Sequence, residues 1–176
     1  MIYIYHHLGL GDHIICNALV RLISKDNRNY GLFCKEHNIK NVSFMFRDVK
    51  NLNIIPIKND SDVSSYNASE IIYVGHQHLN TVMSKNLCFW DEAFYKQFNI
   101  DFVQRWNSFY YERNVMNEKK LYDKLVTNNE KFVLIHNLDS TGTDRINYDF
   151  ISKEYKQIFV DKNEPFFDYG FLIAMA

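Results

Sequence analysis

The sequence predicts an α/β fold, in which a parallel β-sheet flanked by helices is followed by an incomplete second unit of the same kind. Two patterns predict it. Short apolar segments typical of strands alternate with segments whose apolar residues recur at helical spacing. The same alternation restarts near residue 130, after an aromatic region. The composition, 47% hydrophobic and 16% aromatic, is sufficient for a buried core and excludes a disordered chain.

Strands and helices alternate through the first half of the chain. Four segments predict strands, namely 1–5, 29–34, 52–57 and the start of 69–78. From Asp12 to Lys25 the apolar positions follow helical spacing, and Asp12 is placed to act as the N-cap. Residues 35–49 predict a second helix. This order is typical of a parallel sheet, and such sheets bind ligands beyond the carboxyl ends of their strands.

The second half begins with an aromatic, helical region over 91–126, followed by the restart. A strand in "KFVLIHN" is followed by the hydroxyl-rich loop "LDSTGTDRINYDF", which opens a helix, and by a strand in "KQIFVD". A last helix begins at Pro165. We therefore predict a Rossmann-like domain over 1–128 and a partial second one over 129–176, with its own small sheet. So small a unit buries little surface, and we expect "FFDYGFLIAMA" to expose its phenylalanines.

The charge balance limits the partners. Twenty basic residues oppose 21 acidic ones, so no global basic field holds nucleic acid or an anionic membrane. Residues 94–114 interleave aromatics with Lys96, Arg105 and Arg113, a pattern that can stack single-stranded bases but is more typical of a core. No segment has the length and apolarity of a transmembrane helix, and three separate cysteines form no C-x-x-C pair. We expect a cytoplasmic protein.

The loop "GLGDHI", residues 9–14, is the main candidate for a functional site. It is not the dinucleotide fingerprint, because Ile14 stands where glycine or alanine is needed. An ionised Asp12 would also repel a pyrophosphate at this helix N-terminus. Two interpretations remain open: a tight turn capped by an aspartate, and a carboxylate that accepts a proton from a substrate hydroxyl. The helix dipole should lower the pKa of Asp12, whereas a strong base needs it raised.

The apolar strand "MIYIY", the loop "GLGD" and the small and aliphatic residues that follow resemble the N-terminus of GT-B glycosyltransferases of the heptosyltransferase-like branch. The resemblance implies that Asp12 is the general base on the acceptor hydroxyl. We expect Gly9, Gly11, His13 and His76 to contact the substrate at the same edge of the sheet. The resemblance also implies that residues 1–128 form the acceptor-side domain of the protein.

A second likeness to the same family is "FVLIHN" followed by "DSTGTDR". It implies that the donor diphosphate is bound by four residues, Ser140, Thr141, Thr143 and Arg145. The family typically has a lysine here, so Arg145 is a departure, although a guanidinium can contact phosphate through two donors. The family's later glycine-rich donor turn has no counterpart before Ala176, and we expect an incomplete version of the fold.

The resemblance implies a nucleotide-sugar donor, a glycan or other hydroxyl acceptor, and neither metal nor cofactor. The "HQH" at 76–78 could chelate zinc together with His6, His7 and His13, but no acidic or cysteine ligand accompanies it at a familiar spacing. We therefore predict no metal site. The predicted function is sugar transfer by a GT-B enzyme. The alternatives are a non-catalytic nucleotide- or sugar-binding module, and a fragment without activity.

Overall fold

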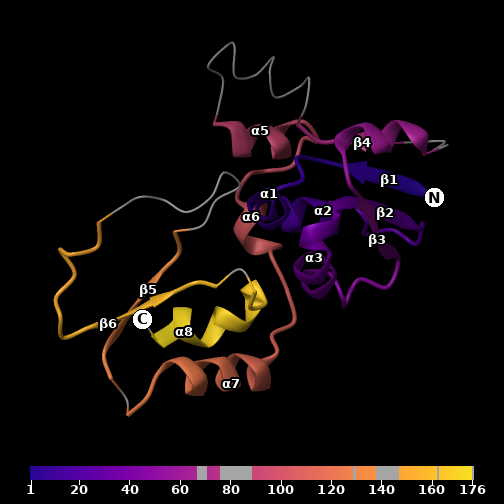
Figure 1. The fold of residues 1–176 in the computed structure, drawn as a ribbon. Helices are drawn as coiled ribbons and strands as arrows, with labels where there is room; N and C mark the ends of the chain where they lie inside the picture. Colours follow the sequence, from indigo (N-terminus) through magenta and orange to yellow (C-terminus); the bar gives the residue numbers. More distant parts are fainter. Residues whose placement is uncertain (67–70, 76–88, 129, 138–146, 162, 176) are drawn as a thin grey trace. The chain divides into compact units, whose positions relative to one another are not determined.

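The computed structural model describes residues 1–66, 71–75, 89–128, 130–137, 147–161 and 163–175. It contains two compact units, Met1–Glu112 and Arg113–Ala176 (Figure 1). A four-stranded parallel sheet lies in the first unit and a two-stranded parallel sheet in the second. The predicted α/β fold, with a parallel sheet followed by a smaller second unit, is confirmed. Within the described residues, none of the helices is long and apolar enough to span a membrane.

The sheet of the first unit has the order β3-β2-β1-β4. Its strands are β1 (Ile2–Tyr5), β2 (Tyr30–Lys35), β3 (Leu52–Ile57) and β4 (Ile71–Tyr73). The register aligns Tyr5 at the end of β1 with Tyr73 at the end of β4. Because every pairing is parallel, the carboxyl ends of all four strands meet at one edge. The loop that follows β1 and leads into α1, where Asp12 lies, leaves from this edge.

Short helices connect these strands, and two more, α5 and α6, follow β4. They are α1 (Leu10–Ile15), α2 (Asn17–Ile23), the 3₁₀ helix η1 (Glu36–Asn38), α3 (Ile39–Met45), the 3₁₀ helix η2 (Asp60–Ser65), α5 (Trp90–Lys96) and α6 (Gln104–Asn107). The single helix predicted from Asp12 to Lys25 is wrong in one respect, because it is interrupted at Cys16, whose ψ of 1° is not helical. After the turn at Cys16, α2 buries Ala18, Leu19 and Val20.

Asn17 fixes the last segment of the first unit, residues 108–112, to the start of α2. Its side-chain amide donates to the carbonyl of Tyr110 at 3.0 Å and accepts from the N–H of Tyr110 at 3.0 Å. The Arg21 guanidinium lies 5.2 Å from the centre of the Tyr110 ring and forms two hydrogen bonds with Asp48. Arg47 donates to the carbonyl of Glu112 at 2.8 Å. The segment is therefore held at Tyr110 and at Glu112.

The second unit has a core of its own. Its elements are α7 (Val115–Leu125), β5 (Phe132–Ile135), β6 (Lys156–Phe159), the 3₁₀ helix η3 (Phe166–Tyr169) and α8 (Gly170–Met175). β5 pairs in parallel with β6, in a sheet separate from the first, as predicted. Apolar side chains from all five elements, and from the residues that directly follow α7 and β6, form one cluster: Leu121, Val126, Phe132, Ile158, Val160, Tyr169 and Leu172.

Two expectations about the second unit were wrong. The C-terminal run does not expose all its phenylalanines, because Phe167 is buried and Tyr169 and Leu172 lie in the core. The loop after β5 was expected to open a helix, yet its described part, residues 147–155, consists of turns and bends. The domain division at residue 128 stays a prediction; α7, which precedes it, packs against η3 and α8 within the second unit.

Candidate functional site

Asp12 lies in the first turn of α1, directly after the carboxyl end of β1. The N-cap of this helix is Gly9, so the prediction that Asp12 is the N-cap was wrong: Asp12 is three residues further on. Its carboxylate turns back and accepts a hydrogen bond from the backbone N–H of Gly9 at 3.1 Å. The acidic side chain therefore makes one half of a capping box and satisfies the backbone N–H of Gly9, whereas Gly9, which has no side chain, makes no side-chain cap hydrogen bond in return.

The Asp12 carboxyl is partly buried, and this sets its acidity. Burial raises its pKa above the ordinary value of 3.8, because desolvation disfavours the charged form. The nearby His7 and the N–H of Gly9 lower the pKa, but their combined effect is smaller. Burial thus outweighs the lowering contacts of His7 and Gly9, and it shifts the pKa of Asp12 in the direction that a base needs. A raised pKa makes the ionised carboxylate a better proton acceptor.

His7 and Gly75 bring the end of β4 next to the Asp12 loop. The N–H of Val74 donates to the carbonyl of Tyr5 at 2.9 Å, which extends the pairing of β4 with β1 by one residue. Gly75 has a φ of 85°, and a Cβ on it would lie 3.2 Å from His7 Nε2 and 2.6 Å from Phe94 Cε1. Only glycine suits this conformation and this close approach. His7, just after β1, thus lies next to Gly75 at the end of β4.

His13 lies in the core and not at the surface. It is completely buried, and its ring meets that of His6, also completely buried, at 4.4 Å between centroids and 73° between planes. Neither ring nitrogen of His13 has a hydrogen-bond partner among the described residues. Burial lowers the pKa of His13 well below its ordinary value, and the charge of His6 lowers it further. This position does not support the predicted contact between His13 and a substrate.

The two glycines of the loop are exposed at the same turn. Gly9 holds the Asp12 carboxylate, while the space where a side chain would start on Gly11 is open, with no atom within 4 Å. Their contact with a substrate stays a prediction. The remaining predicted site residues lie outside the described residues: His76 on the acceptor side, and Ser140, Thr141, Thr143 and Arg145 on the donor side.

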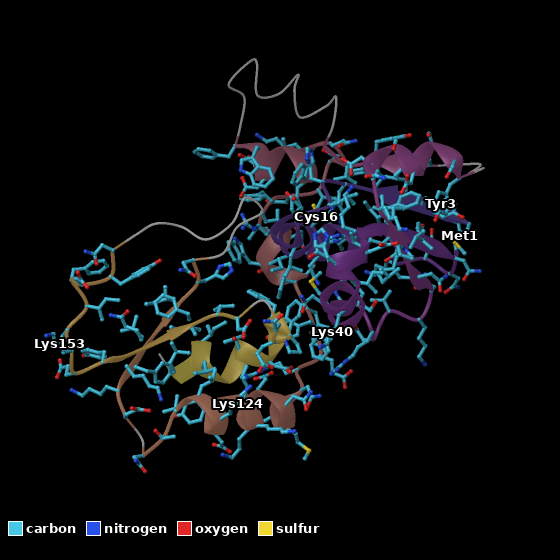
Figure 2. The ribbon with its side chains drawn as sticks, viewed as in Figure 1. Met1, Tyr3, Cys16, Lys40, Lys124 and Lys153 are labelled. Atoms are coloured by element: carbon cyan, nitrogen blue, oxygen red, sulfur yellow. The ribbon has the colours of Figure 1, made fainter. Side chains whose placement is uncertain are left out.

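Candidate metal ligands and cysteine thiols are both present in the described residues. Among the described residues, no group of three or more histidine, cysteine, aspartate or glutamate side chains is arranged to hold a metal ion. Cys16, at the joint between α1 and α2 (Figure 2), and Cys34 in β2 are buried free thiols. Burial raises the pKa of both, to about 12 for Cys34, which makes them inert core residues and not nucleophiles.

The basic residues considered for nucleic-acid binding have acidic partners. Lys96 pairs with Glu92 at 2.9 Å, Arg105 pairs with Asp91, and Arg113 pairs with Glu118. Charges compensated in this way do not form the basic surface that a phosphate backbone needs.

A shallow hollow of about 360 Å³ along α7 is lined by Val115, Met116, Lys119, Lys120 and Asp123, and by none of the predicted site residues.

Sequence reasoning missed the role of His7 and the exposed tryptophan at the start of α5. His7 was grouped with the other histidines, and no spacing rule distinguishes a histidine that faces Asp12 from one that faces the core. Comparison with known proteins adds no family to this description, because no protein-family model, no curated protein and no solved structure matches the chain.

Proposed function

We propose that this chain acts in sugar transfer of the GT-B type, from a nucleotide-sugar donor to an acceptor hydroxyl. The observation that carries the proposal is the Asp12 carboxylate: partly buried, with a raised pKa, held by Gly9 at the carboxyl end of β1. A base on an acceptor hydroxyl has to be fixed in place and poised to take a proton, and these features support that role. The parallel sheets of the two units are consistent with it.

In the proposed step, Asp12 takes the proton of the acceptor hydroxyl while the hydroxyl oxygen attacks the anomeric carbon of the donor. The bond between that carbon and the diphosphate oxygen breaks, and the diphosphate leaves with the electron pair. Attack from the opposite face inverts the anomeric centre. The leaving charge would be stabilised by Arg145 and the hydroxyls of Ser140, Thr141 and Thr143, as the family resemblance implies.

The alternative is a non-catalytic nucleotide- or sugar-binding module, and one observation favours it. The hydrogen bond from the Gly9 N–H to the Asp12 carboxylate already gives this carboxylate a structural role, because it caps the first turn of α1. An aspartate at this position needs no catalytic role to be explained. The two functions share a ligand class and differ in turnover.

A thermal-shift screen against nucleoside diphosphates and their sugar conjugates tests both. A ligand that binds only the folded protein stabilises it by about 2.7 kcal/mol at one hundred times its dissociation constant. We expect one nucleoside diphosphate and its sugar conjugate to raise the unfolding temperature. Release of the nucleoside diphosphate from that conjugate in the presence of acceptors supports transfer, and binding without release supports the module. No stabilisation by any member of the screen would contradict both.

A further inference from the structure

The chain passes from the first unit to the second through residues 108–114, which follow α6 and form neither helix nor strand (Figure 1). The boundary between the two units falls between Glu112 and Arg113. Side chains of each unit hold the backbone on their own side of this boundary. The freedom of the backbone at the boundary therefore depends on how firm these anchors are.

Two of the anchors include a buried polar group. In the first unit, completely buried Asn17 holds both backbone groups of Tyr110 at 3.0 Å. In the second unit, Arg113 donates from Nε to both carboxylate oxygens of Glu118, at 3.0 Å and 3.1 Å, and the Glu118 side chain is 1% exposed. Breaking such a contact is costly, because it leaves a buried polar group without its partner. Tyr110 and Arg113 are therefore fixed, each to its own unit.

The anchor between them is exposed. Arg47, just after α3, donates from Nη2 to the Glu112 carbonyl at 2.8 Å and from Nε to the Glu112 carboxylate at 3.2 Å. The Arg47 side chain is 32% exposed and the Glu112 side chain 58%. Exposed ion pairs are weak and are screened by salt, so the Arg47–Glu112 contact can open while the two buried anchors stay closed.

Arg47 also organises the residue before Glu112. Its guanidinium lies 4.1 Å from the centre of the Phe44 ring. The Phe44 ring in turn meets the Tyr111 ring at 6.4 Å between centroids. Arg47, Phe44 and Tyr111 are thus packed in sequence beside the end of α3, and loss of the Arg47 side chain loosens both Tyr111 and Glu112.

Opening this contact changes the length of unanchored backbone between the units. While it is closed, Glu112 and Arg113 are held on the two sides of one planar peptide bond, and rotation is confined to the torsions beside that bond. When it opens, residues 111 and 112 gain freedom between Tyr110 and Arg113. Two residues extend by at most about 7 Å.

From these contacts we propose that the Arg47–Glu112 contact is a releasable clamp that sets the freedom of the hinge between the two units. In the closed state the hinge is confined to the bond between Glu112 and Arg113. In the open state it includes residues 111–113. The clamp is a property of the fold and does not rest on the proposed function.

The test is double electron–electron resonance on the full chain, with one spin label in each unit. Ser64 and Lys153 are exposed, and Ser64→Cys and Lys153→Cys introduce the labels. Cys16 and Cys34 are buried, so they do not react in the folded chain, and Cys88→Ser removes the third thiol. The measurement gives the distribution of distances between the two units.

We expect Arg47→Ala to broaden this distribution by several ångström, because the released residues add up to about 7 Å of reach. The matched control is Arg28→Ala, which removes another exposed ion pair of the first unit, with Asp26, and should leave the width unchanged. Thermal unfolding shows whether each variant is folded.

Salt provides a test that needs no substitution at Arg47. About 1 M salt shortens the Debye length from about 10 Å at 0.1 M to about 3 Å and should broaden the distribution of the unchanged chain. It should have little further effect in Arg47→Ala, where the contact is already absent.

The proposal is overturned if Arg47→Ala and the unchanged chain give distributions of the same width. Two narrow distributions would mean that other contacts hold the units, and two broad ones that the contact stays open. Equal broadening by Arg28→Ala, or no response of the unchanged chain to salt, would also overturn it. None of these measurements uses a donor or an acceptor, so their outcome is independent of the nucleotide screen.

Discussion

The backbone N–H of Gly9 donates to Asp12 Oδ2 at 3.1 Å, so the carboxylate that we propose as a base also closes the first turn of α1. The two roles can be separated by substitution. Asp12→Ala removes the acceptor and should lower the free energy of unfolding by about 1 kcal/mol, as the loss of a helix cap does. Asp12→Asn keeps an acceptor oxygen and should lose less than about half of that. Urea unfolding measures both, and equal losses would contradict the capping role.

The buried His13 predicts that stability depends on pH. In the unfolded chain its imidazole takes up a proton near its ordinary pKa of 6.5, whereas in the folded chain burial and His6 hold the pKa well below that. The unfolded state therefore binds more protons between these two values. The stabilisation is complete above pH 6.5 and is lost as the pH falls below it, by up to about 1.4 kcal/mol per pH unit.

Urea midpoints measured between about pH 7.5 and about pH 5.5 test this dependence. The unchanged chain should weaken over this range, and His13→Leu should weaken much less because it has no proton to take up. His37→Gln is the matched control, since His37 is exposed, and should follow the unchanged chain. An equal loss in His13→Leu and in the unchanged chain would contradict the assignment.

Asn17 should be essential for holding residues 108–112. Its amide satisfies both backbone groups of Tyr110 and is completely buried. Asn17→Ala leaves a buried donor and acceptor without partners and should cost about 2–4 kcal/mol of stability. Asn27→Ala, in an exposed turn, should change the stability by less than about 0.5 kcal/mol. Chemical denaturation measures both, and similar values for the two variants would show that this contact contributes little.

Gly170 and Glu118 should be energetically coupled in the second unit. The Glu118 side chain is 1% exposed and holds Arg113 Nε at 3.0 Å and 3.1 Å, and a Cβ on Gly170 would lie 2.8 Å from its Oε2. Gly170→Ala should therefore cost about 1–3 kcal/mol in the unchanged chain, and clearly less in Glu118→Ala, where the carboxylate is gone. Gly11→Ala, with open space at its Cβ, is the control and should be neutral or stabilising.

A double-mutant cycle on thermal or chemical unfolding measures this coupling. The account predicts that the two substitutions together cost less than the sum of their separate costs. Strict additivity would mean that the carboxylate and the glycine do not constrain each other.

The sequence was sufficient for the strands and for their order of connection, because short apolar runs between turn residues indicate buried strands whatever surrounds them. It also placed Asp12 at the start of a helix. The sequence could not identify the N-cap of α1, because glycine and aspartate both occur at N-cap positions. The hydrogen bond from the Gly9 N–H to the Asp12 carboxylate distinguishes the two. The interruption between α1 and α2 at Cys16 could not be predicted, because no proline or glycine occurs there.

The direction of side chains was the part that sequence could not determine. His7 and His13 are both polar residues beside Asp12, yet one reaches Gly75 at the sheet edge and the other is buried against His6. Histidine occurs both at sheet edges and in protein cores, so residue type alone does not predict which of the two is buried. The same holds for Trp90. Its position depends on the contact of its ring with Phe94, and on the hydrogen bond from Gly75 to Gln97 that fixes the end of α5 beside β4.

The central claim is that Asp12 acts as the base, and the most direct test compares turnover with donor binding in Asp12→Asn. With the donor identified by the nucleotide screen, we expect release of the nucleoside diphosphate to fall by at least about one hundredfold, within the range typical of a lost general base. The dissociation constant of the donor should change by less than about twofold, because the proposed base acts on the acceptor hydroxyl and not on the donor. Turnover in Asp12→Asn equal to that of the unchanged chain would contradict the claim.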